Sequence, residues 1–234
     1  MIYYDLGELA EAVFIKRLNR FAALVELNYS PIEVHVANTG RMRELLYPGA
    51  HVWLKKATNP KRKLAYDLLL GEYEGRKICL NAQLANDFVD LWLQNGFLRE
   101  LGAYNSWRRE YRYGASRFDF LLEDRKKDEK MLLEVKSVNY RVGDAAVFPD
   151  APTARGAKHL EELLIWQKQG LGQSAICFVV MGHDTKYLHT NKMTDPLFDE
   201  ALRQAQEAGV RVLVYKSFIK ENRVYFEDEI NYQR

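Results

Sequence analysis

Short apolar runs separated by turn residues fill the first third of the chain. Pro48-Gly49 and Asn59-Pro60 are typical of the breaks, and Gly, Pro and Asn in such places mark turns between strands. Four or five short strands with regular turns predict a small β-barrel, of which an OB-like barrel is one form. The strands that we expect are Ala22–Leu27, Glu33–Ala37, His51–Lys56, Tyr66–Tyr73 and Lys77–Leu80.

The hydrophobic period changes after residue 81. Apolar side chains then recur with the spacing of an amphipathic helix, and a glycine at position 96 ends the pattern. We therefore predict two domains, a barrel over residues 1–81 and a second domain over residues 82–234. The helical positions are Leu84, Phe88, Leu91 and Trp92.

Strand-like and helical segments alternate through the second part. The continuous apolar run Ala175–Met181 is expected to be a strand buried on both faces. The order α-β-β-β-α-β-α-β predicts an α/β (α+β) fold with a mixed central sheet covered by helices. The other segments are strands at Arg108–Tyr113, Arg117–Glu123, Met131–Val138 and Val210–Tyr215, and helices around Ala157–Leu164 and Leu197–Ala208.

The composition is ordinary for a globular protein with a core, at 47% hydrophobic, 12% aromatic and 28% charged residues. No apolar run approaches the roughly 20 residues of a membrane span, and the first residues lack the basic start of a signal peptide. We therefore expect a cytoplasmic protein without membrane contact. Cys79 and Cys177 lie in apolar runs and are expected to be reduced and buried.

The net charge of +2 does not by itself indicate a partner, but basic residues gather in two places. Lys61, Arg62 and Lys63 follow a turn, where they can contact a phosphate backbone with salt-sensitive, sequence-independent affinity. Arg108 and Arg112 alternate with aromatic side chains that can stack on bases. The alternative for this second cluster is that the aromatic side chains belong to the core and the arginines to a solvated face.

Two carboxylates and a lysine stand out in neighbouring strands. Side chains alternate along a strand, so Glu134 and Lys136 are expected on one face of theirs. Asp119 is expected on the face opposite Phe118 and Phe120. Where the two strands are antiparallel neighbours, Asp119 and Glu134 meet at one edge of the sheet.

A divalent cation suits this arrangement, because two adjacent carboxylates repel and are costly to desolvate. Mg²⁺ binds through one or two carboxylates together with water and substrate phosphate oxygens. We therefore predict that Asp119 and Glu134 bind Mg²⁺ or Mn²⁺. Lys136 is expected to orient the attacking water or to stabilise the phosphate.

The alternative is that the three residues form an ordinary surface salt bridge, because Asp, Glu and Lys are common. Two features favour a site. Charges interrupt the apolar run of residues 131–138, where unpaired charges are costly. The element order also matches the core of the PD-(D/E)XK nucleases, although Phe118 stands where a proline is usual before the first acid.

The segment after these strands is a loop that enters a helix. Thr153 is a suitable N-cap, and the free N–H groups of the first turn favour anions. Arg155, Lys158 and His159 follow within about one turn and form either a phosphate clamp or the solvated face of a capped helix. Asp150 is either a further metal ligand or a turn residue, and we favour the turn.

Several runs of the chain resemble signatures of the sugar fermentation stimulation protein A (SfsA) family. Departures are small: Ala37, Pro152 and Ala154 stand where Pro, Val and Glu are usual. The resemblance covers roughly residues 12–218. It rests on His35 with Asn38-Thr39-Gly40 and Met42, on Pro48-Gly49 with Val52 and Trp53, on Phe14 with Arg20-Phe21, on Tyr113 to Ser137, and on Phe148 to Leu160.

The resemblance implies an N-terminal OB-like domain that binds nucleic acid and a C-terminal nuclease-like domain. It implies DNA, single- or double-stranded, as a partner that is bound without strong sequence preference, and a regulatory link to sugar (maltose) metabolism. It does not establish that members of the family cleave DNA.

Two functions follow from these observations. The first is a Mg²⁺- or Mn²⁺-dependent nuclease with Asp119, Glu134 and Lys136 at its centre, and with Glu100 as a weaker candidate for an extra acid. The second is a non-catalytic, non-specific DNA-binding regulatory protein. A sugar-related enzyme has no supporting signature, and a homodimer is compatible with the sequence.

Overall fold

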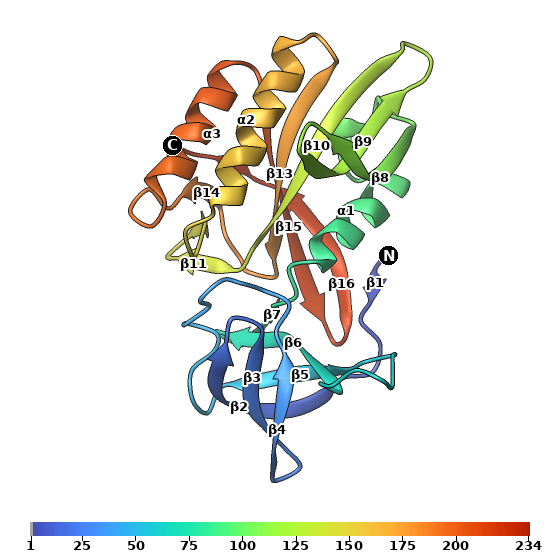
Figure 1. The fold of residues 1–234 in the computed structure, drawn as a ribbon. Coiled ribbons are helices and arrows are strands. Elements are labelled where there is room, and N and C mark those ends of the chain that lie inside the picture. The colour runs from blue at the N-terminus through green and yellow to red at the C-terminus, as the bar shows by residue number, and fades with distance from the viewer. Residues whose placement is uncertain (1) are drawn as a thin grey trace.

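Six strands of the N-terminal part form a strongly curved sheet, at the bottom of Figure 1. The computed structural model describes residues 2–234. A parallel pairing of β4 with β6 closes five of the six strands into a barrel with the strand connectivity of an OB fold. In sheet order the strands are β4 (Ser30–His35), β3 (Ala22–Leu27), β2 (Ala10–Asn19), β5 (His51–Lys56), β6 (Tyr66–Tyr73) and β7 (Arg76–Cys79).

Two details of the barrel differ from the expected strands. The long strand β2 was not predicted, because bulges after Phe14 and after Arg17 interrupt its alternation of buried and exposed positions. The strand predicted at Glu33–Ala37 instead begins at Ser30, because the turn lies at Asn28-Tyr29, where both residues have positive φ.

Seven strands form the second sheet, which lies above the barrel in Figure 1. The three central strands β10, β13 and β15 run parallel, and the outer strands are antiparallel to their neighbours, so the sheet is mixed as predicted. In sheet order the strands are β1 (Tyr4–Asp5), β16 (Arg223–Glu229), β15 (Arg211–Lys220), β13 (Gln173–Met181), β10 (Glu129–Val138), β9 (Ser116–Asp124) and β8 (Ser106–Tyr113).

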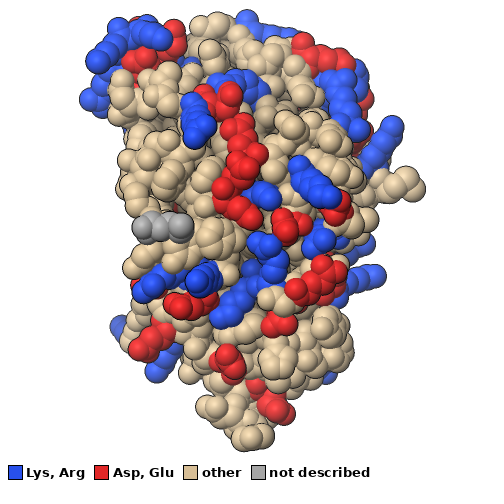
Figure 2. Space-filling model, turned by 180° about the vertical axis from the view of Figure 1, so that it is seen from behind, with Lys and Arg blue, Asp and Glu red and all other residues tan. Residues whose placement is uncertain are grey.

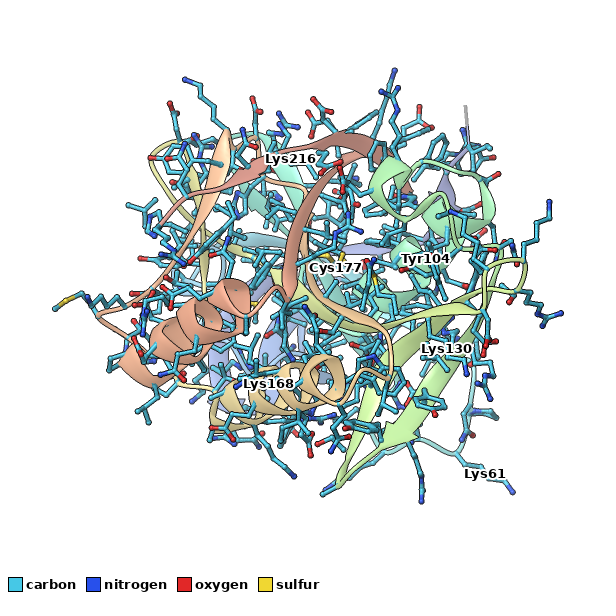
Figure 3. All side chains as sticks on the ribbon, turned by 90° about the horizontal axis from the view of Figure 1, so that it is seen from above. Lys61, Tyr104, Lys130, Lys168, Cys177 and Lys216 are labelled. Atoms are coloured by element: carbon cyan, nitrogen blue, oxygen red, sulfur yellow. The ribbon has the colours of Figure 1, made fainter. Side chains whose placement is uncertain are left out.

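Helices cover both faces of this sheet, as the view from above shows (Figure 3). α1 (Leu84–Gln94) and the short 3-10 turn Arg99–Leu101 pack on the face that carries Leu133 and Cys177. α2 (Ala154–Lys168) and α3 (Pro196–Glu207) pack on the opposite face. The mixed sheet with helices and the preceding barrel confirm the predicted fold class. Within residues 2–234, no helix combines the length and the apolar character needed to cross a membrane.

A small four-stranded sheet, which the sequence did not predict, lies beside the start of α2. Its strands are only two to four residues long, too short for a periodic signal. The sheet matters because the loop that carries Asp150 to the start of α2 leaves one of its strands. The strands are β11 (Tyr140–Val142), β12 (Ala145–Phe148), β14 (Tyr187–Thr190) and β17 (Asn231–Tyr232).

The barrel and the second sheet are joined by close, specific contacts. The buried side chain of Asn139 donates to the backbone oxygen of Cys79 and accepts from the side chains of Asn38 and Ser137. At the end of β13, a Cβ atom on Gly182 would lie 2.5 Å from the backbone oxygen of Lys77 on β7. The two parts therefore meet backbone to backbone at this point.

We predict that Gly182→Ala destabilises the protein much more than Gly75→Ala. Both glycines have positive φ, but only Gly182 faces a backbone atom of the other part, whereas Gly75 has nothing within 4 Å. Gly75→Ala is expected to lower the free energy of unfolding by about 1 kcal/mol, and Gly182→Ala by about 3 kcal/mol or more. Urea denaturation measures both, and equal losses would contradict the close contact.

Candidate functional site

Asp119 lies where β9 and β10 separate. The two strands pair from Asp124 and Glu129 as far as Phe120 and Leu133, and the ladder then ends. Beyond this point the Asp119 carboxylate replaces the missing partner, since its Oδ2 accepts from the backbone N–H of Val135 at 2.7 Å. The fork therefore supplies a backbone donor that holds one oxygen of the carboxylate.

The fork also overturns one expectation from alternation. Phe120 packs in the core on the α1 side, and Phe118 packs in the core on the α2 side. The two rings therefore do not share a face of the sheet. Asp119 is directed back towards β10, where Asn86 of α1 donates to its Oδ1 at 2.6 Å. Sequence reasoning missed Asn86, which is 33 residues away.

Glu134 lies two residues further along β10 than Leu132 and faces α2, with only 3% of its surface exposed. Its Oε1 accepts from the ammonium of Lys136 at 2.5 Å, so the two side chains share a face as alternation predicted. The same Oε1 lies 2.5 Å from Nδ1 of His159. Oε2 is buried and has no partner among the described residues.

His159 reaches Glu134 from the first turns of α2. Thr153 caps this helix by accepting from the N–H of Gly156 at 3.1 Å, as the sequence predicted. Arg155 donates its Nε to Nε2 of His159 at 3.3 Å. Because Nε2 accepts, Nδ1 carries the hydrogen and donates to Glu134. Two donors thus hold one carboxylate oxygen and leave the other free.

The sequence places His159 in the basic cluster at the start of α2, whereas the structure buries it at 2% exposure. The sequence pattern could have indicated this burial, because His159 shares one helix face with the buried Leu163 and Trp166 at the i, i+4, i+7 spacing. Arg155 and Lys158, by contrast, are exposed, and Arg155 lies one turn before His159 on the same face of the helix.

The pKa values of the two carboxyl groups are shifted in opposite directions. Burial and the neighbouring charge of Glu134 raise the pKa of Asp119 to about 6. Burial acts to raise the pKa of Glu134 as well, but the charge of Lys136 and the hydrogen bond from His159 outweigh it, so this pKa lies below its usual value. At neutral pH Glu134 is therefore ionised, and the pKa of Asp119, about 6, lies close to neutral pH.

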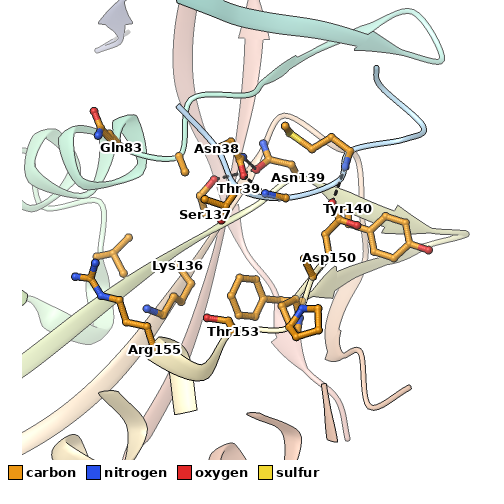
Figure 4. Close-up of a pocket in the computed structure, with 18 of the residues that line it drawn as sticks. Asn38, Thr39, Gln83, Lys136, Ser137, Asn139, Tyr140, Asp150, Thr153 and Arg155 are labelled. Carbon is orange, nitrogen blue, oxygen red and sulfur yellow. Dashed lines mark hydrogen bonds between the residues drawn. The ribbon is translucent and has the colours of Figure 1, made fainter. Parts of the chain in front are cut away.

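A cavity of about 450 Å³ opens above these residues (Figure 4). One wall comes from the second sheet and the start of α2, and the opposite wall comes from the barrel. The barrel contributes Arg20, Asn38, Thr39, Gly40 and Met42, and the facing side includes Gln83, Asn86, Asp119, Glu134, Lys136, Ser137, Tyr140, Asp150 and Arg155.

The barrel wall is held in place at both ends. The backbone N–H of Met42 donates to Oδ2 of Asp150 at 2.6 Å, so this carboxylate joins the two parts, a contact that the sequence did not predict. Within the barrel, Arg17 donates to the backbone oxygens of Asn38 at 2.6 Å and Gly40 at 3.2 Å. Residues 38–40 carry part of the family resemblance, and these contacts with distant residues explain the shape of the segment.

The basic residues predicted at the turn before β6 lie outside the cavity. Lys61 and Lys63 are exposed, and Figure 3 shows Lys61 directed away from the body of the protein. Arg62 makes a two-fold ion pair with Asp67, with both distances 2.9 Å. Burial opposes ionisation of Asp67, but Arg62 and His35 hold its pKa below the usual value.

The basic residues of the edge strand β8 also lie outside the cavity. Arg108 pairs with Glu123 at 3.1 Å, and Arg112 pairs in register with Arg117 of β9. The neighbouring tyrosines 111 and 113 pack against Trp166, which favours the core alternative for these rings.

On the face shown in Figure 2, Lys and Arg gather around the middle of the molecule and alternate with Asp and Glu, so charges of both signs are mixed there.

The side chains in the cavity suit a small divalent cation of the Mg²⁺ type. Among residues 2–234, no group of three or more His, Cys, Asp or Glu side chains is placed to enclose a metal ion. Mg²⁺, however, usually takes only one or two carboxylates and completes its shell with water and phosphate oxygens. Asp119, with the free oxygen of Glu134, provides such an open, two-carboxylate set.

Comparisons with known proteins identify the family. A model described as the sugar fermentation stimulation protein RE domain matches residues 83–223, and one described as the SfsA N-terminal OB domain matches residues 15–80. The chain belongs to the sugar fermentation stimulation protein family. Its predicted resemblance to this family is therefore confirmed, and the OB description agrees with the observed barrel.

Relatives in this family match along nearly the whole chain. A sugar fermentation stimulation protein homolog of Clostridium tetani is 41% identical over 219 residues, covering 94% of each chain. A homolog of Clostridium kluyveri is 40% identical over 235 residues, covering 100% of each. The structure of Pyrococcus furiosus SfsA in complex with Ca²⁺ aligns over 100% of both chains with a TM-score of 0.93 at 27% identity.

We predict that Asp119→Asn stabilises the protein at high pH. The pKa of Asp119 is raised from 3.8 to about 6 in the folded state, so stability falls as the pH rises from about 3.8 to about 6 and stays lower above that range. With divalent ions chelated, the variant is expected to gain roughly 3 kcal/mol at pH 8 and less than about 1 kcal/mol near pH 4. Denaturant titrations at the two pH values measure this, and a gain independent of pH would contradict it.

Proposed function

We propose that this protein is a divalent-metal-dependent nuclease that acts on DNA. The observation that carries the proposal is the carboxylate of Glu134, with one oxygen held by Lys136 and His159 and the other buried without a partner. An ionised oxygen that is buried and unpaired is costly. A cation bound there removes this cost and explains why the oxygen is left free.

Each residue of the site has a proposed role. Asp119 and Glu134 hold the ion, which when bound activates water and neutralises charge on a phosphate. Lys136, which donates to Glu134, stabilises the negative charge that builds on the phosphate. Asn86 and the N–H of Val135 fix the orientation of Asp119.

The Ca²⁺ complex of Pyrococcus furiosus SfsA supports a divalent ion in this family. Ca²⁺ and Mg²⁺ both prefer oxygen ligands, and the open two-carboxylate set favours Mg²⁺ or Mn²⁺ as the working ion here. We also propose that residues 1–81 act as the nucleic-acid-binding part and residues 82–234 as the catalytic part. Lys61, Lys63, Arg155 and Lys158 are the proposed exposed contacts to phosphates.

We predict that purified protein cleaves DNA with Mg²⁺ or Mn²⁺ and that Asp119→Ala and Lys136→Ala each lower the rate at least about 100-fold. Glu100→Ala is the control, since Glu100 pairs with Arg211 outside the cavity. Radiolabelled or fluorescent DNA on denaturing gels measures the rates. DNA binding without cleavage under either ion would favour the non-catalytic regulatory alternative.

His159 is proposed as a positioning residue for Glu134, and two near-isosteric variants test it. The amide nitrogen of asparagine lies near the place of Nδ1, whereas that of glutamine lies near the place of Nε2. His159→Gln therefore loses the donor to Glu134 and is expected to bind Ca²⁺ about tenfold more weakly, while His159→Asn stays close to the wild-type affinity.

Isothermal titration calorimetry with Ca²⁺ measures both variants without relying on activity. Thermal denaturation with chelator shows whether either variant has lost its fold. Equal affinities for the glutamine and asparagine variants would contradict the positioning role.

A further inference from the structure

The acids of the site lie at the bottom of a cavity, not on an open surface. Glu134 is 3% exposed, and the barrel turn of residues 38–42 stands opposite it. A phosphate must therefore enter the cavity to reach Glu134 and Asp119. The turn cannot simply move aside, because Met42 is bonded to Asp150 and Asn38 to Asn139.

A second hollow of about 400 Å³ continues from the first. Arg155 and His159 contribute to it, and Arg155 also lines the main cavity. The remaining lining comes from the turn between β8 and β9 and from the start of α2, with Arg117 and Lys158 as its charged members. The two hollows therefore adjoin at Arg155.

Positive charges occur at intervals along this path. Arg20 lines the barrel side and is exposed, and its guanidinium makes no hydrogen bond or ion pair within residues 2–234. Lys136 and Arg155 follow near the acids, and Figure 4 shows both directed into the same part of the cavity. Lys158 lies beyond them, with its closest acid, Glu162, at 4.0 Å. Cations along such a path can supply the salt-sensitive contacts that a nucleic-acid backbone makes.

An exposed aromatic ring lies at the barrel end of the path. Phe21 follows Arg20 in the turn between β2 and β3, and 53% of its surface is exposed. A large apolar side chain is costly in water, and exposed aromatic rings beside cations are the usual stacking platforms for unpaired bases. The amide of Gln83 and the hydroxyl of Thr39 are also exposed in the cavity and are suited to base edges.

We propose that the site accepts a single unpaired DNA strand, which passes from Arg20 and Phe21 over the acids to Arg155 and Lys158. This rests on the proposed function and names its substrate class. A cavity of about 450 Å³ is at the small end of ligand pockets, which hold about one drug-sized molecule. One nucleotide fits such a space, but a base-paired duplex with its second strand does not.

Binding is tested with the whole protein in Ca²⁺, using fluorescence anisotropy of a labelled 15-nucleotide strand and of the same sequence as a blunt duplex. The single strand is expected to bind at least about tenfold more tightly. Arg20→Ala and Lys158→Ala are each expected to weaken single-strand binding about fivefold and to reduce its salt slope by about 0.7. Phe21→Ala is expected to weaken it about tenfold without changing the slope.

Tyr29→Ala is the matched control. Tyr29 is 95% exposed at the opposite end of β3 from Phe21. The substitution therefore removes an exposed aromatic ring of the same barrel that lies away from the path. Its affinity is expected to equal that of the wild type. Equal binding of duplex and single strand, or equal losses for Tyr29→Ala and Phe21→Ala, would overturn the proposal.

A cleavage experiment separates this proposal from the proposed function. With Mn²⁺, a duplex that carries a single-stranded tail is expected to be cut only in the tail, and Asp119→Ala is expected to abolish the cut. Cutting within the paired region at an equal rate would leave the nuclease function standing and reject the single-strand path. Tight single-strand binding that depends on Arg20 and Lys158, with no cleavage of any DNA, would support the path and reject the nuclease.

Discussion

The site depends on a carboxylate buried with half of its hydrogen bonds made. Lys136 and His159 both donate to Oε1 of Glu134, and nothing donates to Oε2. A fully satisfied glutamate would be a structural ion pair, and an exposed one would be solvated. Only a carboxylate with one paired and one unpaired oxygen leaves a negative charge that a bound cation can neutralise. The surrounding elements hold Glu134 in this arrangement.

This arrangement needs three elements to meet correctly. The fork between β9 and β10 presents Asp119, the capped start of α2 brings His159, and α1 supplies Asn86. The barrel then covers the acids from the opposite side through the bonds of Asn38 and Met42. Because the cavity has walls from both parts, the barrel is a component of the site and not only a neighbouring module.

Local patterns predicted the parts of this site that depend on local geometry. Strand alternation placed Glu134 and Lys136 on one face, and the N-cap chemistry of Thr153 placed the start of α2. The change of hydrophobic period after residue 81 predicted a two-part fold, and the family resemblance implied the same division. The sequence did not reveal the contacts of Asn86 with Asp119 or of Asn38 with Asn139, because these pairs are separated by 33 and 101 residues. No local period encodes such a pairing.

The most direct test of the account is a crystal structure determined with Mn²⁺, using anomalous scattering to locate the ion. The account predicts one strong Mn²⁺ peak within coordinating distance of Asp119 and of Oε2 of Glu134. It also predicts that the peak disappears in Asp119→Ala crystals grown in the same way. Mn²⁺ bound elsewhere, with both carboxylates free of it, would contradict the account.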